Sequence, residues 1–225
     1  DYYASRGLGD VYKRQVKKHN LRFIVDAMSS FGAVDVNVSE LGIDFLISSA
    51  NKCIQGVPGF SFIVARREAL TATEGNARTI SLDLHSQWKT MEKDNGKWRF
   101  TSPTHVVAAF AQALKELQQE GGVTVRGERY ATTNRKLREG MRTLGFEPFV
   151  SEAFQGPIIT TFLYPEGRNL DFKHMHHWLK EQGYVIYPGK LTDRDTFRIG
   201  NIGEIYDADA DRILELFAQY TKEFM

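Results

Sequence analysis

Three short apolar runs in the first third of the chain constrain its fold more than any other feature. They occupy residues 21–25 (LRFIV), 43–47 (IDFLI) and 60–65 (FSFIVA) and are rich in Ile, Val and Phe. Runs of this length without polar–apolar alternation are typical of strands buried on both faces of a sheet. Residues 38–41 predict a short helical turn between the first two runs. The pattern therefore predicts the sheet of an α/β fold.

The N-terminal segment does not share this order. Residues 1–15 (DYYASRGLGDVYKRQ) show neither a helical nor a strand period and contain no initiator Met. We interpret this segment as a non-native leader and exclude it from the fold prediction. A natural but irregular N-terminal arm is the alternative.

Residues 16–145 are predicted to form part of one large domain. The polar stretch 71–99 is predicted to cross its surface as helix and loop. Two long helices follow, each ended by glycine: residues 104–119, with Thr104 as a candidate N-cap, and residues 123–144.

A smaller α+β domain is predicted over residues 146–225. Strands and helices alternate there, with strands at 158–163, 184–187 and 196–199 and helices at 170–182 and 207–224. Asp207 is the predicted N-cap of the last helix. We expect this domain to pack on the larger one.

The charge balance and the single cysteine exclude several classes of function. The chain has 29 Lys and Arg against 28 Asp and Glu, so a net charge of +1 gives no long-range attraction to nucleic acid or membrane. No apolar run reaches the roughly 18 residues of a membrane span, and no apolar signal-peptide region is visible. Cys53 is the only cysteine, which excludes a disulfide framework within the chain and predicts a reducing, cytoplasmic location.

Two charged side chains follow predicted strands. Asp26 ends the first strand, and open α/β sheets bind ligands beyond the carboxyl ends of their strands. An Asp that caps the following turn is the alternative. Lys52 follows the second strand in the segment SSANKC, and a desolvated lysine is a competent nucleophile toward carbonyl groups. A surface lysine on a loop is its alternative.

Together, Asp26 and Lys52 match the needs of a pyridoxal cofactor. A carboxylate keeps the pyridine nitrogen protonated, which makes the ring an electron sink. A lysine holds the aldehyde as an imine and later moves the proton. The pair is therefore more specific than either residue alone.

The segments that carry this pair, VDAMSSFG and LISSANKCIQGVPGF, resemble the 2-aminoethylphosphonate–pyruvate transaminases. These are class V enzymes of pyridoxal-phosphate fold type I, and the resemblance runs from about residue 16 to the C-terminus. It implies a partial fold-type I large domain with a mostly parallel sheet, followed by a C-terminal α+β small domain. It also implies that Lys52 binds pyridoxal phosphate and that Asp26 faces the pyridine nitrogen.

The same resemblance implies roles for Thr101 and Arg198. Thr101, in WRFTSP, matches the threonine that reaches across a homodimer to the cofactor phosphate; a residue capping the next helix is the alternative. Arg198, in FRIGNIG, matches the arginine that clamps the acid group of the substrate, because its forked donors suit a carboxylate or phosphonate. A structural ion pair with Asp or Glu is the alternative for Arg198.

No metal site is expected. His174 and His177 share a helix face, but no acidic or Cys ligand stands at matching spacing, so a solvated helix face is favoured; His176 lies off that face. Cys53 is expected to fill a small buried space, since the reactive cysteine of class V cysteine desulfurases lies on a separate loop.

The implied reaction is transamination of 2-aminoethylphosphonate with pyruvate, two small anions that Arg198 would hold in turn. Serine–pyruvate or alanine–glyoxylate transamination is the alternative, although those families usually have Gln at the position of Asn51. An inactive fragment is a further alternative.

The family's longer N-terminal part supplies a turn for the cofactor phosphate and an aromatic residue that stacks on the cofactor ring, and no residue here matches them. We therefore expect the chain as given to be poorly active and to leave strand edges and apolar faces bare.

Overall fold

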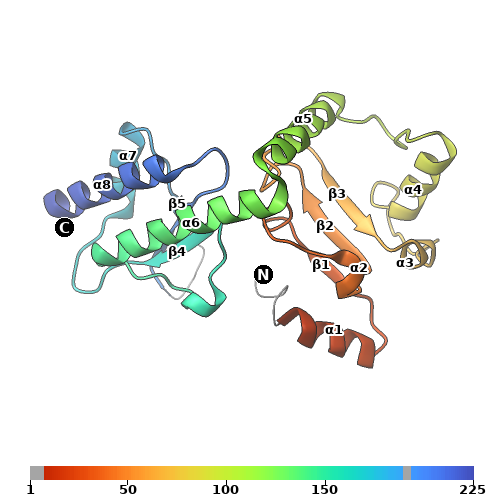
Figure 1. Ribbon diagram of the computed structural model, residues 1–225, viewed down its shortest axis with the longest axis horizontal. Helices are drawn as coiled ribbons and strands as arrows, with labels where there is room; N and C mark the ends of the chain where they lie inside the picture. Colours follow the sequence, from red (N-terminus) through yellow and green to blue (C-terminus); the bar gives the residue numbers. More distant parts are fainter. Residues whose placement is uncertain (1–7, 190–193) are drawn as a thin grey trace. The chain divides into compact units, whose positions relative to one another are not determined.

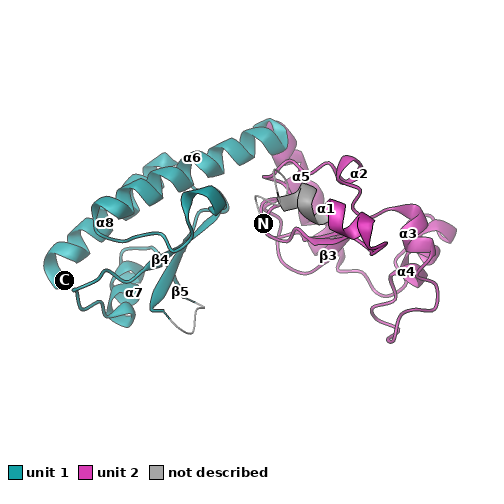
Figure 2. Cartoon of the chain, turned by 90° about the horizontal axis from the view of Figure 1, so that it is seen from below, with its two compact units in different colours: residues 1–3, 120–225 teal, residues 4–119 magenta. Residues whose placement is uncertain are grey.

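The computed structural model describes residues 8–189 and 194–225, which form two compact units. Among the described residues these units are 8–119 and 120–225, coloured separately in Figure 2. The division differs from the predicted domain boundary at 145/146. The long helix α6 (Gly122–Thr143) packs on α8 and β4, so its residues belong to the C-terminal unit.

The N-terminal unit is built on a three-stranded sheet (Figure 1). Its strands lie in the order β1 (Ile24–Asp26), β2 (Phe45–Ser49) and β3 (Ser61–Ala65). The pair β1–β2 is parallel and β2–β3 is antiparallel, so the described sheet is mixed rather than mostly parallel.

Strands β1 and β2 begin two or three residues later than the apolar runs predict. The buried side chain of Asp44 explains the shift, because its carboxylate accepts the Phe23 N–H at 2.9 Å and pairs with Arg66 at 2.5 Å. These polar contacts precede the regular ladder and fix where it starts.

Five helices complete the described N-terminal part: α1 (Leu8–Lys18), α2 (Val38–Leu41), α3 (Arg67–Thr71), α4 (Leu84–Lys93) and α5 (Thr104–Glu120). The turn predicted at 38–41 is α2. Residues 8–15 are helical, although they were predicted to lack a helical period, and Lys17 and Lys18 in the last turn favour that helix end. Thr104 is the first residue of α5 and not its cap, and Gly121 ends α5 with a φ of +113°.

The sheet of this unit has apolar contacts on both faces. Leu46 is fully buried with Ala27 and Ile43, whereas Phe45 packs with Ala69 and Leu70. An aromatic cluster joins α5 to β3 and to the loop after β1, with ring centroids 5.2–5.4 Å apart among Phe31, Phe60, Phe62 and Phe110.

The C-terminal unit has a second sheet, antiparallel throughout, in the order β4 (Ile159–Leu163), β6 (Thr196–Gly200) and β5 (Tyr187–Pro188). Its other elements are α6, the short 3-10 helix η2 (Glu152–Phe154), α7 (Phe172–Glu181) and α8 (Asp207–Phe224). Phe162, Phe197 and Phe217 are fully buried at the centre of its core.

Two predictions for this unit are wrong in detail. The strand predicted at 184–187 is reduced to Tyr187–Pro188, because the Tyr184 N–H donates to Leu179 O at 2.9 Å and closes α7 instead. Tyr206 rather than Asp207 caps α8, and Asp209 accepts the Tyr206 N–H at 2.9 Å in return. Across the described stretches, no helix is both long and apolar enough to cross a membrane.

Candidate functional site

Asp26 and Lys52 both lie at the carboxyl-end edge of the N-terminal sheet. Asp26 is the last residue of β1 and pairs in register with Ile47 of β2. Lys52 lies three residues beyond the end of β2. Because β1 and β2 are parallel neighbours, the loops that follow them leave the sheet at the same edge.

These two loops are packed against each other. The Ser48 hydroxyl donates to Ala27 O at 3.1 Å, and the Cys53 thiol donates to Ser29 O at 3.3 Å. Gly32 has a φ of +99°, and a Cβ there would lie 2.6 Å from Ile54 Cδ1. The buried Cys53 therefore joins the loops rather than only filling space.

A tight turn follows Lys52. The Gln55 N–H donates to Lys52 O and the Gly56 N–H donates to Ala50 O, both at 2.8 Å. Gly56 is needed there, since a Cβ would lie 2.7 Å from Ala50 O. Gln55 has a φ of +66°, a left-handed conformation that side chains rarely adopt and that is often found near functional sites.

The side chain of Lys52 is half-buried. Its exposure is therefore intermediate between the two alternatives from the sequence, a desolvated amine and a surface lysine. Among the described residues, no carboxylate lies within ion-pair distance of its ammonium. The amine is therefore not committed to a salt bridge in this part of the chain.

Asp26 is exposed, and one of its carboxylate oxygens caps the turn that follows. Its Oδ1 accepts the Met28 N–H at 2.9 Å. This contact is the one expected from the turn-capping alternative. Within residues 8–189 and 194–225, Oδ2 makes no hydrogen bond, so it is open to a second donor.

Ser49 is a polar residue of this edge that the sequence analysis did not single out. It is 7% exposed, and its hydroxyl has no hydrogen-bond partner among the described residues. A buried hydroxyl without a partner is costly unless a ligand or water satisfies it. The pair Ser48-Ser49 at the end of an apolar strand was the available signal.

Thr101 lies in the loop before α5 and is exposed. It does not cap α5, because that helix begins three residues later, at Thr104. The capping alternative is therefore wrong. Its hydroxyl makes no hydrogen bond to other described residues.

Arg198 is the central residue of β6 and belongs to the C-terminal unit. Its Nε donates to Pro188 O at 3.0 Å, and its guanidinium carbon lies 5.9 Å from the centroid of the Tyr187 ring. No described carboxylate pairs with it, so the structural ion pair weighed as its alternative is absent from this part of the chain.

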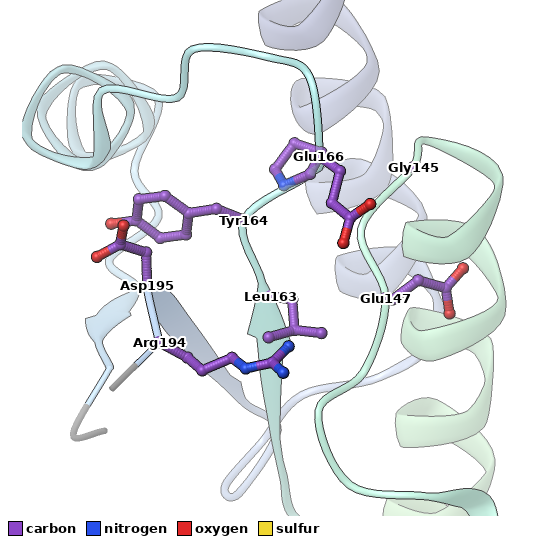
Figure 3. Close-up of a pocket in the computed structure, with 8 residues that line it drawn as sticks. Gly145, Glu147, Leu163, Tyr164, Glu166, Arg194 and Asp195 are labelled. Atoms are coloured by element: carbon purple, nitrogen blue, oxygen red, sulfur yellow. The ribbon is translucent and has the colours of Figure 1, made fainter. Parts of the chain in front are cut away.

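A separate cavity of about 450 Å³ in the C-terminal unit contains none of the predicted site residues (Figure 3). Its polar lining consists of Glu147, Glu166, Asp195, Arg194 and Tyr164. Burial raises the pKa of Tyr164, and the negative charges of Asp195 and Asp171 raise it further. Three carboxylates against one arginine disfavour an anionic ligand there.

The three histidines of α7 have other contacts. His174 Nδ1 lies 2.9 Å from the Tyr220 hydroxyl, His177 Nε2 lies 3.2 Å from Glu181 Oε1, and His176 packs on the Phe172 ring. Within the described part of the chain, no group of three or more His, Cys, Asp or Glu side chains is placed to hold a metal ion.

The sequence of this chain matches a known family over most of its length. The family described as aminotransferase class-V matches residues 10–193. Three curated relatives, each a 2-aminoethylphosphonate–pyruvate transaminase, come from Bacteroides fragilis, Phocaeicola vulgatus and Klebsiella pneumoniae. They are 61%, 56% and 55% identical over 89%, 92% and 92% of this chain. The alignments cover 55%, 57% and 57% of those proteins, so the chain spans about half the length of the curated relatives it matches.

Solved structures share the fold. A ureidoglycine–glyoxylate aminotransferase from Bacillus subtilis aligns with a TM-score of 0.81 at 21% identity, covering 96% of this chain and 56% of that one. An alanine–glyoxylate aminotransferase from Nostoc sp. aligns with a TM-score of 0.80 at 20% identity over the same shares. The predicted fold class, a partial fold-type I α/β domain with a C-terminal α+β unit, is confirmed.

Proposed function

Because this chain belongs to the class-V aminotransferase family, we propose that it contributes to a pyridoxal-phosphate-dependent transamination of 2-aminoethylphosphonate with pyruvate. The products would be phosphonoacetaldehyde and L-alanine. The observation that carries the proposal is the packing of the Asp26 and Lys52 loops at one edge of a parallel strand pair. The names of relatives at 55–61% identity support this substrate pair over the serine or glyoxylate alternatives.

The residues at this edge fit a pyridoxal cofactor. The half-buried Lys52 amine has no described carboxylate partner, and one oxygen of Asp26 is open. The buried Ser49 hydroxyl has no partner among the described residues, which suits a polar group bound nearby. The tight approach at Gly56 keeps side-chain atoms away from the turn after Lys52.

When bound, pyridoxal phosphate supplies an electron sink for the charge left as the substrate Cα loses its proton. Lys52 would bind the aldehyde carbon through its amine and, once released, carry the proton from the substrate Cα. The open oxygen of Asp26 would accept a hydrogen bond from the protonated pyridine nitrogen and keep it charged. The Met28 N–H bond to the other oxygen holds that carboxylate in one orientation.

Arg198 would hold the phosphonate of one substrate and the carboxylate of the other. Each of these anionic groups can offer two of its oxygens to the guanidinium fork. The absence of a described ion pair at Arg198 leaves its terminal nitrogens available for this contact.

The proposal includes a cytoplasmic homodimer in which Thr101 meets the cofactor phosphate of the partner subunit. Its support is an exposed hydroxyl without a described partner, in the loop three residues before the long helix α5. The single cysteine fits a reducing compartment.

Cofactor trapping tests the assignment of Lys52. The chain is incubated with pyridoxal phosphate, reduced with borohydride and mapped by peptide mass spectrometry. We expect the reduced adduct on Lys52, because its amine is partly desolvated and unpaired among the described residues, whereas surface lysines are more solvated. Lys52→Ala should remove both this adduct and the visible absorbance of the imine.

Lys97→Ala is the matched control, since Lys97 is an exposed loop lysine of the same unit, and it should leave the Lys52 adduct unchanged. Labelling spread over surface lysines, with Lys52 unmodified, would contradict the proposal. The substrate pair is tested separately on the full-length enzyme, by comparing L-alanine formation from pyruvate with aminoethylphosphonate and with L-serine as amino donors. Faster reaction with L-serine would favour the rival transaminase.

A further inference from the structure

Strand β5 holds the guanidinium of Arg198 through two neighbouring residues. The Pro188 carbonyl accepts Nε at 3.0 Å, and the Tyr187 ring centroid lies 5.9 Å from the guanidinium carbon. Tyr187 is also the register partner of Arg198 across the β5–β6 pair. This hydrogen bond uses the Nε–H, the donor nearest the aliphatic part of the side chain, and leaves the two terminal nitrogens unused. It therefore restricts rotation of the planar guanidinium group.

The position of the Pro188 carbonyl is fixed by backbone contacts. The next residue, Gly189, donates its N–H to Thr196 O at 2.8 Å. A Cβ at Gly189 would lie 2.3 Å from that same oxygen, so glycine alone permits this approach of β5 to β6. The acceptor for Arg198 Nε is therefore held by the sheet itself.

Burial in the hydrophobic core does not explain why an aromatic side chain stands at position 187. The side chain of Tyr187 is 54% exposed, although it contributes a ring to the guanidinium of Arg198. A ring over a guanidinium is attractive and also limits the orientations that the cation adopts. Among the described residues, the terminal nitrogens of Arg198 have no hydrogen-bond acceptor, since its hydrogen bond to Pro188 uses Nε.

From this geometry we infer that Tyr187 is a positioning residue for Arg198. Its ring and the Pro188 carbonyl together hold the guanidinium so that both terminal nitrogens are presented to two oxygens of one phosphonate or carboxylate. The inference rests on the proposed function of Arg198 and deepens it. Without the ring, the guanidinium populates orientations that do not bind, and the apparent Kd rises as the competent fraction falls.

Methylphosphonate binding to the 225-residue chain tests this role, with the nitrogen–proton NMR signal of Arg198 Nε as the readout. Tyr187→Leu should weaken binding about five-fold, the effect of losing one cation–π contact. It should also speed exchange of the Nε proton with water, which a purely structural role would leave unchanged. Tyr187→Phe keeps the ring and should bind as the wild type does.

Two further variants keep the result interpretable. Tyr187→Thr removes the ring with a residue of high strand propensity, and it should behave as Tyr187→Leu does. Tyr206→Leu is the matched control, because Tyr206 is 47% exposed and its ring lies 4.8 Å from a different arginine, Arg129. Methylphosphonate binding should be unchanged in that variant.

The outcomes separate this inference from the proposed function. Absence of a saturable shift of the Arg198 Nε signal in the wild type would remove Arg198 as the anion-binding residue. So would unchanged methylphosphonate affinity of Arg198→Ala, measured by titration calorimetry because that variant has no Nε signal. Wild-type binding with equal affinity in Tyr187→Leu and Tyr187→Thr would overturn the positioning role alone. A loss of affinity in Tyr187→Phe as large as in Tyr187→Leu would also overturn it, because the ring would then not be the cause.

Discussion

Glu152 accepts hydrogen bonds from two arginines of α6, which makes the stability of the C-terminal unit depend on pH. The bond from Arg138, followed by that from Arg142 at 3.1 Å, lowers the pKa of Glu152 from 4.5 to about 2. A carboxylate with a lowered folded-state pKa stabilises the fold above its unfolded pKa and loses that contribution as pH falls toward the folded value. The Glu152 side chain is 60% exposed, so solvent screening limits the effect to roughly 0.5–1 kcal/mol.

We therefore expect Glu152→Gln to lower the free energy of unfolding near neutral pH and to have a smaller effect near pH 2. Urea unfolding of the C-terminal unit at the two pH values measures this difference. Glu139→Gln is the control, since Glu139 is exposed on the same helix and makes no described ion pair. An equal effect of Glu152→Gln at both pH values would contradict the assignment.

For the two residues proposed to carry the site, the sequence predicted their position relative to the strands better than their environment. Asp26 ends one apolar strand and Lys52 follows another, and strand ends are visible as apolar-to-polar transitions. The unpartnered Ser49 hydroxyl, the left-handed Gln55 and the ring of Tyr187 depend on contacts between distant segments. No local pattern encodes such contacts, so these features required coordinates.

A buried amide network ties the end of strand β6 to helix α6. The Asn201 side chain is fully buried, and its Nδ2 donates to Tyr130 O at 2.9 Å and to Pro157 O at 3.0 Å. Its Oδ1 accepts from Asn134 Nδ2 at 3.1 Å. Asn201→Ala would leave these partners buried without replacement bonds, and we expect a loss of about 2–3 kcal/mol in the free energy of unfolding.

Urea unfolding of the C-terminal unit measures this loss, with Asn169→Ala as the control because Asn169 is exposed and has no described side-chain bond. The double variant Asn134→Ala, Asn201→Ala should lose less than the sum of the single losses, since the two residues share one network. Additive losses would show that the two amides act independently.

Element boundaries were predictable where one pattern dominates. The α8 range 207–224 and the α2 range 38–41 agree with the structure. Helical periodicity marks α8, and Gly42 marks the end of α2. The strands were less accurate, since the side chain of Asp44 and the backbone of Tyr184 are engaged in contacts made before their ladders begin. Hydrogen bonds outside the ladders, one between distant segments at Asp44 and one at the end of α7 for Tyr184, thus set strand starts that hydrophobicity alone places too early.

At the scale of the whole molecule, the N-terminal sheet is uncovered at its margins. Strands β1 and β3 are the outer strands of the order β1-β2-β3, so each has one edge without a described partner strand. Ile24 is 59% exposed, and Ile63 and Val64 of β3 are 37% and 40% exposed. Unpaired edges with apolar side chains favour pairing with other chains.

We expect the chain to associate as its concentration rises. The variant Ile63→Lys should weaken that association about five-fold. A lysine on an edge strand opposes strand pairing, and the substitution removes roughly 1 kcal/mol of apolar burial from the interface. Sedimentation velocity over a concentration series measures the change.

Leu82→Lys is the matched control: Leu82 is 81% exposed in the same unit but lies in a turn, so its replacement should leave association unchanged. If Leu82→Lys weakens association as much as Ile63→Lys does, total exposed apolar surface rather than the β3 edge drives it. If the wild-type chain stays monomeric throughout, the exposed edge does not mediate association at all.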